Sequence, residues 1–384
     1  MQRPLYQVAD VLERNGESLS EYTGNTWQLR TLHALRKCRT AALGGHIDRC
    51  DNAKCNQLHL SYNSCRNRHC PKCQGHKREA WIRAREEELL NVPYFHVVFT
   101  LPDTLNRLCL YAPKQVYTIL FGTAWSVLRD FGADPKFLGA GMGMVAILHT
   151  WGQNLSLHPH LHCIVPGGGI TAKGKWKYAK NKGKYLFPVK AMGKVFRARF
   201  VEKTRKEFDR PRSFYDKLFA KDWVVYAKRP FASPQYVVEY LGRYTHKIAI
   251  GNHRIASLAN GKVTFTAKDY GKGGARQLLS LSDAEFIRRF SLHILPKGFV
   301  RIRHYGILSS SKKKIVLPLL MAEMGRPTPK QEPSPILHRR CPRCREGTLV
   351  TVFMFDGRGP PEHWIAKLEQ QHGTSPDRNG VMAV

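Results

Sequence analysis

A pair of histidines on a predicted strand is the first feature of this chain that could do chemistry. His160 and His162 alternate with apolar residues from Leu161 to Val165, and this alternation predicts a short strand. Residues two apart on a strand point to the same face, so the two imidazoles would project together. Neighbouring imidazoles form half of a site for a divalent metal. The pair alone is equally consistent with two surface histidines on a half-buried strand.

Three tyrosines lie about eighty residues further on. Tyr236, Tyr240 and Tyr244 are spaced four apart and follow Ser233-Pro234, which is a favourable helix start. A helix places the three rings on one face. Such an aromatic stripe usually packs into a core, but each phenol needs a polar partner, and neighbouring valines and a leucine already supply an apolar face. The phenols could therefore face a metal site.

Cysteines in the first part of the chain have the spacing of a zinc site. Cys70-Pro-Lys-Cys73 is a knuckle whose tight turn lets two thiolates bind one ion, and Cys50 and Cys55 can supply the second pair for a tetrahedral zinc. The ligand set stays open, and a second metal is an alternative, because further candidates are near: Cys38, Cys65, His46, His59 and His69.

A second cysteine pair lies near the other end of the chain. Cys341-Pro-Arg-Cys344 is half of a zinc site, and no second cysteine pair follows it. His338 and His363 are candidate partners. Residues 325–335 are rich in proline and predict a linker before this pair.

The composition indicates a nucleic-acid partner. The chain has 62 Lys and Arg against 29 Asp and Glu, a net charge of +33, and a polyanion explains such an excess better than solubility does. No apolar run is long enough to span a membrane, and the first residues lack the apolar core of a signal peptide. We therefore expect a cytoplasmic, nucleoid-associated protein whose ten cysteines are thiols or metal ligands rather than disulfides.

The strands and helices predicted around these residues indicate an α+β fold. At 384 residues the chain exceeds one typical domain. Strands are predicted over 94–101 and 144–149, and the second should pair with residues 160–165 through the loop 152–158. The predicted divisions are an N-terminal helical segment (1–45), a zinc-binding module (46–77), a linker helix (78–93), the main domain (94–325), and a Pro-rich linker with a C-terminal CxxC tail (326–384).

Two basic stretches suit single-stranded DNA. Residues 171–206 interleave lysines and arginines with aromatic residues. The basic side chains would contact the DNA backbone, and the aromatic rings would stack on unstacked bases. A solvated charged hairpin is the alternative reading of this stretch. Residues 299–308 alternate apolar and basic side chains, so one face would be buried and the other cationic.

The histidine strand and the tyrosine helix together resemble the HUH superfamily of single-strand DNA nucleases. The segments TWGQNLSLHPHLHCIVPGGG and YLGRYTHK look like the rolling-circle insertion-sequence transposases that carry two tyrosines, the IS91 type. The phrase SYNSCRNRHCPKCQ resembles the zinc-binding module at the start of the same transposases. In that family the first cysteine pair is usually CxxC, whereas here it is CxxxxC.

The resemblance implies an HUH endonuclease-like antiparallel sheet flanked by helices and preceded by a small zinc-binding module. It also implies a catalytic Mg²⁺ or Mn²⁺ ion beside the structural Zn²⁺. HUH enzymes complete the histidine pair with a His, Glu or Gln, so we expect His160, His162 and Gln153 as ligands, with His149 as the second choice for the third.

The resemblance further implies a transposase that nicks and rejoins single-stranded DNA through a 5′-phosphotyrosine. Tyr240 and Tyr244 match the family pair, and Tyr236 falls outside it. The partners would be single-stranded DNA of element ends and target, and a host helicase, because the chain has no GxxxxGK[ST] P-loop. A replication initiator or relaxase would share the core, and a zinc-finger DNA-binding protein without catalysis is the alternative. The expected DNA contacts are Arg66, Arg68, Arg243, His246, Lys247, Arg301 and Arg303. The oligomeric state is left open.

Overall fold

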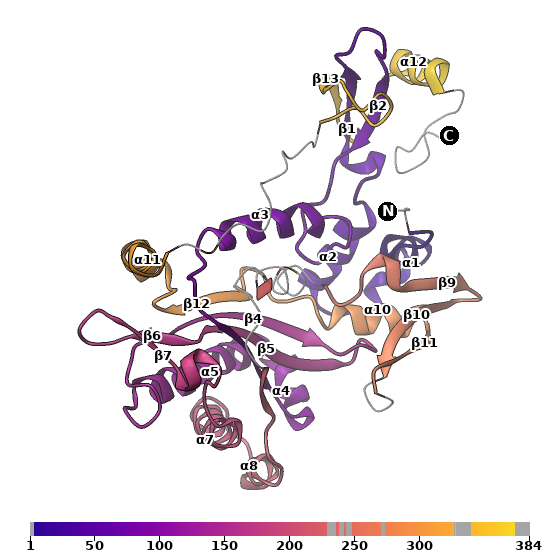
Figure 1. Ribbon diagram of the computed structural model, residues 1–384. Coiled ribbons are helices and arrows are strands. Elements are labelled where there is room, and N and C mark those ends of the chain that lie inside the picture. The colour runs from indigo at the N-terminus through magenta and orange to yellow at the C-terminus, as the bar shows by residue number, and fades with distance from the viewer. Residues whose placement is uncertain are drawn as a thin grey trace.

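The structure is a computed structural model of the chain (Figure 1). It describes residues 4–228, 236–237, 242, 248–269, 273–325, 327 and 339–372, and for residues 75–80 the backbone alone.

An antiparallel sheet with strand order β12-β4-β5-β3-β8 forms the centre of the molecule (Figure 1). All of β4 is buried, because this strand lies inside the sheet and both faces of the sheet are covered. β4 and β5 form the predicted hairpin, in which His149 pairs with His160 and Ile147 with His162. The strands are β3 (Tyr94–Thr100), β4 (Gly143–Trp151), β5 (Leu157–Pro166), β8 (Val225–Lys228) and β12 (Ile302–Gly306).

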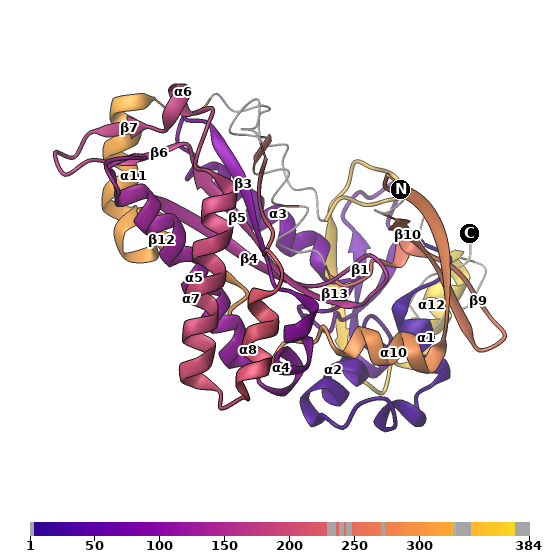
Figure 2. The same ribbon diagram turned by 90° about the horizontal axis from the view of Figure 1, so that it is seen from below.

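Helices cover one face of this sheet (Figure 2). Alternate residues of β5, namely Leu161, Cys163 and Val165, pack into the apolar cluster that these helices complete. The longest of the helices begins at Pro113, since proline is well tolerated in a first helical turn. The helices are α4 (Asn106–Tyr111), α5 (Pro113–Ala133), α7 (Val189–Glu207) and α8 (Arg212–Phe219).

The opposite face of the sheet carries the histidines beside a second apolar cluster. Val145, Ile147 and Ile164 belong to this cluster, together with residues of α11 (Ser310–Met324). Because side chains alternate along a strand, His160 and His162 share the face of Ile164. The helix α3 (Gln74–Glu86) lies over this same side in Figure 1.

A second antiparallel sheet, with the order β11-β10-β9, packs against the N-terminal helices. Arg14 forms an ion pair with Asp283, and Trp27 Nε1 donates to the Leu295 carbonyl at 3.0 Å. The N-terminal helices therefore pack against the second half of the chain. The elements are α1 (Val8–Arg14), α2 (Thr26–Arg36), β9 (Ile255–Ala259), β10 (Lys262–Asp269), β11 (Ala275–Ser282) and α10 (Asp283–Ser291).

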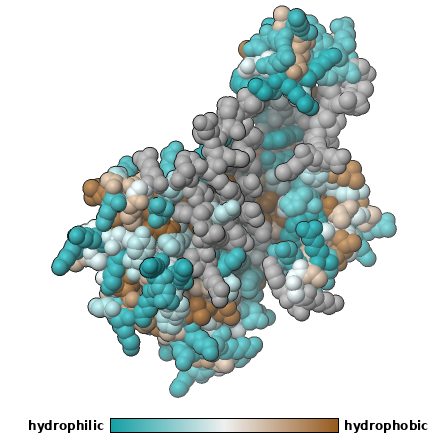
Figure 3. Space-filling view, in the orientation of Figure 1, coloured by the Kyte–Doolittle hydropathy of each residue, from teal (hydrophilic) through white to brown (hydrophobic). Residues whose placement is uncertain are grey.

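A third sheet, with the order β13-β1-β2, projects from the rest of the molecule (Figure 1). It consists of β1 (Gly45–Cys50), β2 (Leu58–Tyr62) and β13 (Leu349–Phe355), and α12 (Glu362–His372) packs against it. We call these four elements the distal module. Hydrophilic residues dominate its surface in Figure 3.

The predicted α+β class is confirmed, and the alternative reading of the basic stretch 171–206 as a charged hairpin does not hold for most of it. Much of the basic stretch 171–206 belongs to α7, whose apolar residues pack against the central sheet, so the stretch is not a single charged hairpin. Within the described residues, no helix is both long and apolar enough to cross a membrane. The short elements are η1 (Ser18–Ser20), η2 (Ala41–Leu43), η3 (Asp103–Leu105), β6 (Gly168–Ile170), β7 (Trp176–Tyr178), α6 (Lys180–Gly183) and η4 (Asn252–Arg254).

Candidate active site and zinc sites

Three imidazoles from the central hairpin meet on the helix α3 side of the sheet. His149 of β4 and His160 and His162 of β5 each offer a nitrogen, and these nitrogens all lie within 4.8 Å of one another. The antiparallel register places His149 directly beside His160, and the two-residue period brings His162 to the same face. The ring of His149 stacks on Trp151 with ring centroids 4.5 Å apart.

Hydrogen bonds orient two of these rings. His160 Nδ1 lies 2.7 Å from the His158 carbonyl oxygen, which can only accept, so Nδ1 carries the proton and Nε2 keeps its lone pair. His162 Nδ1 lies 2.7 Å from Nε2 of His96 on β3, while His162 Nε2 lies 3.1 Å from His160 Nε2. Each ring therefore directs its Nε2 toward the same point.

His96 was not among the predicted site residues. Burial, followed by the nearby charge of Lys228, lowers its pKa to about 4, so the imidazole is neutral near pH 7 and can pair with His162 as donor or acceptor. The sequence signal was a histidine within an apolar strand that neighbours the histidine strand.

The imidazole set fits a divalent cation. Three neutral nitrogen donors leave coordination positions for a phosphate oxygen and water. Of the two ions that the resemblance implies, imidazole favours Mn²⁺ over Mg²⁺, which prefers oxygen ligands. Gln153, the first choice for the third ligand, lies in the β4–β5 loop, and its backbone carbonyl accepts a hydrogen bond from Arg254. His149, the second choice, is the residue that the structure groups with the histidine pair.

The predicted nucleophiles lie outside the described residues, and so do three of the predicted DNA contacts. These residues are Tyr240, Tyr244, Arg243, His246 and Lys247. Three residues of the same segment are described, and two of them carry side chains. The side chain of Tyr236 is exposed, whereas Val237 is fully buried in the cluster that contains Ile147 and Ile164.

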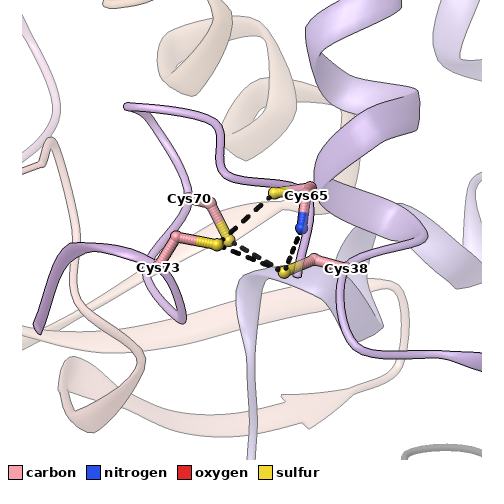
Figure 4. Close-up of side chains that lie close together, drawn as sticks. All are labelled: Cys38, Cys65, Cys70 and Cys73. Carbon is pink, nitrogen blue, oxygen red and sulfur yellow. Dashed lines mark hydrogen bonds between the residues drawn. The ribbon is translucent and has the colours of Figure 1, made fainter. Parts of the chain in front are cut away.

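A buried cluster of cysteines lies beside the N-terminal helices (Figure 4). Cys38 Sγ lies 3.5 Å from Cys73 Sγ and 3.4 Å from Cys70 Sγ, and Cys65 Sγ lies 3.7 Å from Cys73 Sγ. Four thiolates at these separations suit one tetrahedral zinc, whose bonds of about 2.3 Å place the sulfurs about 3.8 Å apart. We call this group the core cysteine cluster.

The other predicted ligands have a different location. Cys50 and Cys55 lie in the distal module and group there with Cys341 and Cys344. The predicted arrangement of Cys50, Cys55, Cys70 and Cys73 around one ion is therefore corrected: each pair joins a different partner pair. The prediction grouped cysteines that are close in sequence, whereas the partners of Cys50 and Cys55 lie almost three hundred residues away.

Comparisons with known proteins show the family of the chain. Residues 143–315 match a family described as "Putative transposase", and residues 11–101 match one described as "Transposase zinc-binding domain". Over 392 aligned residues the chain is 41% identical to "Putative transposase y4qJ" of Sinorhizobium fredii (strain NBRC 101917 / NGR234), an alignment that covers 93% of this chain and 98% of that protein. The chain belongs to the IS91-type transposases.

A second relative of this transposase is named for its element. The two proteins are 30% identical over 325 residues, and the relative is "Transposase for insertion sequence element IS801" of Pseudomonas savastanoi pv. phaseolicola. The alignment covers 79% of this chain and 76% of the relative. No solved structure matches the chain.

The two family matches contain different groups of candidate metal ligands. The match to the zinc-binding domain contains the whole core cysteine cluster, which supports structural zinc. The other match contains the three imidazoles together with β12. Cys341 and Cys344 lie outside both matches.

The described arginines among the predicted DNA contacts occupy different positions. Arg68 donates to the backbone carbonyls of Pro296 (2.9 Å) and Phe299, which joins the cysteine segment to the chain before β12. Arg301 is buried, and this burial lowers its pKa to about 10. The Arg303 guanidinium lies over the Phe121 ring, 4.4 Å from its centroid. Arg66 is exposed directly after Cys65, so among the described arginines Arg66 and Arg303 remain candidate DNA contacts.

Proposed function

We propose that this transposase nicks and rejoins single-stranded DNA at the ends of its element, by tyrosine attack, during rolling-circle transposition. The observation that carries the proposal is the convergence of His149, His160 and His162 beside the cluster that buries Val237. On the helix predicted from the sequence, Tyr240 and Tyr244 come three and seven positions after Val237 and so share its side. The nucleophiles would then face the imidazoles.

The chemistry requires help because a phenol has an ordinary pKa near 10. A Mg²⁺ or Mn²⁺ ion bound by the imidazoles would polarise the scissile phosphate. The phenol oxygen of Tyr240 or Tyr244 forms a bond to phosphorus, the bond to the 3′ oxygen breaks, and that oxygen leaves as a free hydroxyl. The 5′-phosphotyrosine conserves the phosphodiester energy, so rejoining by a 3′-hydroxyl needs no ATP. A second tyrosine one turn away can attack while the first is occupied.

A basic and aromatic surface supports single-stranded DNA as the substrate. Tyr178 and Tyr185 are 46% and 44% exposed and can stack on unpaired bases. Exposed lysines surround them and can contact the phosphates: Lys173, Lys175, Lys177, Lys180, Lys182 and Lys184. We place the reaction in the cytoplasm on nucleoid DNA, with a host helicase separating the strands.

The proposal is tested by trapping the covalent intermediate. Labelled single-stranded element-end DNA is incubated with the protein and Mn²⁺, and the products are separated on a denaturing gel. We expect a protein-sized labelled band that the Tyr240→Phe, Tyr244→Phe double variant loses and the control Tyr236→Phe keeps. Because EDTA also strips zinc, the His160→Ala, His162→Ala variant tests the catalytic metal. Tight binding of authentic ends without such a band contradicts the proposal and indicates a DNA-binding protein or an inactive copy.

A further inference from the structure

The four cysteines of the distal module stand at zinc-binding distances. Cys50 Sγ lies 3.7 Å from Cys344 Sγ, and Cys55 Sγ lies 3.8 Å from Cys341 Sγ. All four sulfurs lie within 4.8 Å of one another, and none is in a disulfide. Tetrahedral zinc places its sulfur ligands about 3.8 Å apart. We infer that Cys50, Cys55, Cys341 and Cys344 form a second structural zinc site, which ties the C-terminal segment 339–372 to the β1–β2 hairpin. We call this group the distal cysteine cluster.

The backbone around the distal cysteine cluster is shaped as two knuckles. Arg345 follows Cys344 with a φ of 60°, in the left-handed region that non-glycine residues rarely adopt. The Arg345 amide donates to the Cys341 carbonyl at 2.9 Å, which closes the turn. The Gly347 amide lies 3.3 Å from Cys344 Sγ and donates to it, as amides do around metal-bound thiolates. Cys55 is likewise followed by a left-handed residue, Asn56, with a φ of 43°.

Glycine at position 347 permits the two knuckles to meet. A Cβ built on Gly347 would lie 2.4 Å from Cys50 Sγ, so any other residue would push the two halves of the site apart. The close approach joins backbone from one end of the chain to a thiol from the other.

The core cysteine cluster repeats this local geometry. Arg39 follows Cys38 with a φ of 56°, and Arg66 follows Cys65 with a φ of 51°. The core cluster lies within the match to a transposase zinc-binding domain, whereas half of the distal cluster lies beyond it. The same sulfur spacing and the same turn therefore occur twice in the chain, once with its ligands close in sequence and once across its two ends.

The described part of the distal module has a small apolar core. Its buried apolar residues are Ile47, Leu58, Leu60 and Leu368, with partly buried residues of β2, β13 and α12 packed against them, and β13 pairs with β1 across about three hundred residues of chain. Bringing such distant segments together costs loop-closure entropy, and a structural metal offsets it by binding only the folded arrangement. Docking of the C-terminal segment should therefore depend on zinc.

The first test counts thiolate-bound metal in the full-length protein. Co²⁺ is exchanged for zinc, and the sulfur-to-cobalt charge-transfer absorbance is measured per chain, because this band reports cysteine sites and not the imidazole site. We expect the absorbance of two four-cysteine sites in the wild type, and half of it in the Cys341→Ser, Cys344→Ser variant. The control Cys109→Ser, which removes a buried cysteine outside both clusters, should keep both sites. Absorbance of one site in the wild type, or full absorbance in the double variant, overturns the inference.

A second measurement needs no variant and so does not depend on a variant folding. The zinc-loaded protein is alkylated with iodoacetamide, with and without a chelator, and each cysteine is followed by mass spectrometry. We expect Cys50, Cys55, Cys341 and Cys344 to be protected together and to become reactive together when zinc is removed. Alkylation of Cys341 and Cys344 in the zinc-loaded protein overturns the inference, as does finding iron rather than zinc in the purified chain.

Discussion

The central sheet and the distal module hold their functional side chains in different ways. In the central sheet, two adjacent strands place His149, His160 and His162 side by side, and large apolar clusters cover both faces. In the distal module, a small apolar core lies beside cysteines from distant parts of the chain. The fold of the central sheet therefore does not depend on the histidines. The fold of the distal module, in contrast, depends on the cysteines that it holds.

Zinc removal should separate the two regions most clearly. Structural zinc contributes on the order of 10 kcal/mol to small metal-bound folds, which is as large as the whole stability of a typical domain, about 5–15 kcal/mol. A chelator should therefore abolish hydrogen-exchange protection in residues 45–62 and 349–372, while residues 143–151 and 157–166 keep theirs. The measurement is hydrogen exchange followed by mass spectrometry. Equal loss of protection in both regions would show that the central sheet is held by metal too.

Changing the histidines should have the opposite effect, which is a loss of activity without a loss of structure. The His160→Ala, His162→Ala variant should lose about 10³-fold or more in single-turnover cleavage of element-end DNA, since metal polarisation supplies several kcal/mol to a phosphoryl transition state. The melting temperature and the zinc content should change little, because the apolar clusters and the cysteines remain. Cleavage within tenfold of the wild type would remove these imidazoles from the reaction.

Acid should destabilise the central region through a buried histidine. Burial lowers the pKa of His293 to about 4 from 6.5, so the folded state binds fewer protons than the unfolded chain between these values. Stability is therefore complete above pH 6.5 and falls as the pH drops toward 4. The neutral substitution His293→Gln should remove up to about 3 kcal/mol of this loss, measured as unfolding free energy against pH. An unchanged pH profile would contradict the assignment.

The smallest effect is expected from the residue that orients a ligand. His96→Phe keeps a ring stacked on His162 but loses the hydrogen bond, and outer partners of this kind contribute 10–100-fold to metal affinity, as an order of magnitude. Mn²⁺ affinity should fall by that factor at constant melting temperature, and His96→Gln should recover part of it. If both variants bind Mn²⁺ like the wild type, His96 has only a packing role.

The same contrast explains what the sequence could predict. The β4–β5 hairpin and the shared face of His160 and His162 follow from a two-residue period, which is a local pattern. The membership of the zinc sites depends on where β13 pairs, and no local pattern specifies a partner for Cys341. Positive charge in the sequence also did not identify the DNA contacts. Arg199 lies in the basic stretch 171–206, but it forms an ion pair with Asp130 at 2.7 Å within the protein.

The most direct test of the proposed reaction locates the covalent bond. The trapped complex is digested with nuclease and protease, and the peptide that carries the nucleotide is sequenced by mass spectrometry. We predict a 5′-phosphate on Tyr240 or Tyr244, formed only when His160 and His162 are present. A nucleotide on Tyr236, on a serine or on a histidine, or attachment through a 3′-phosphate, would contradict the account.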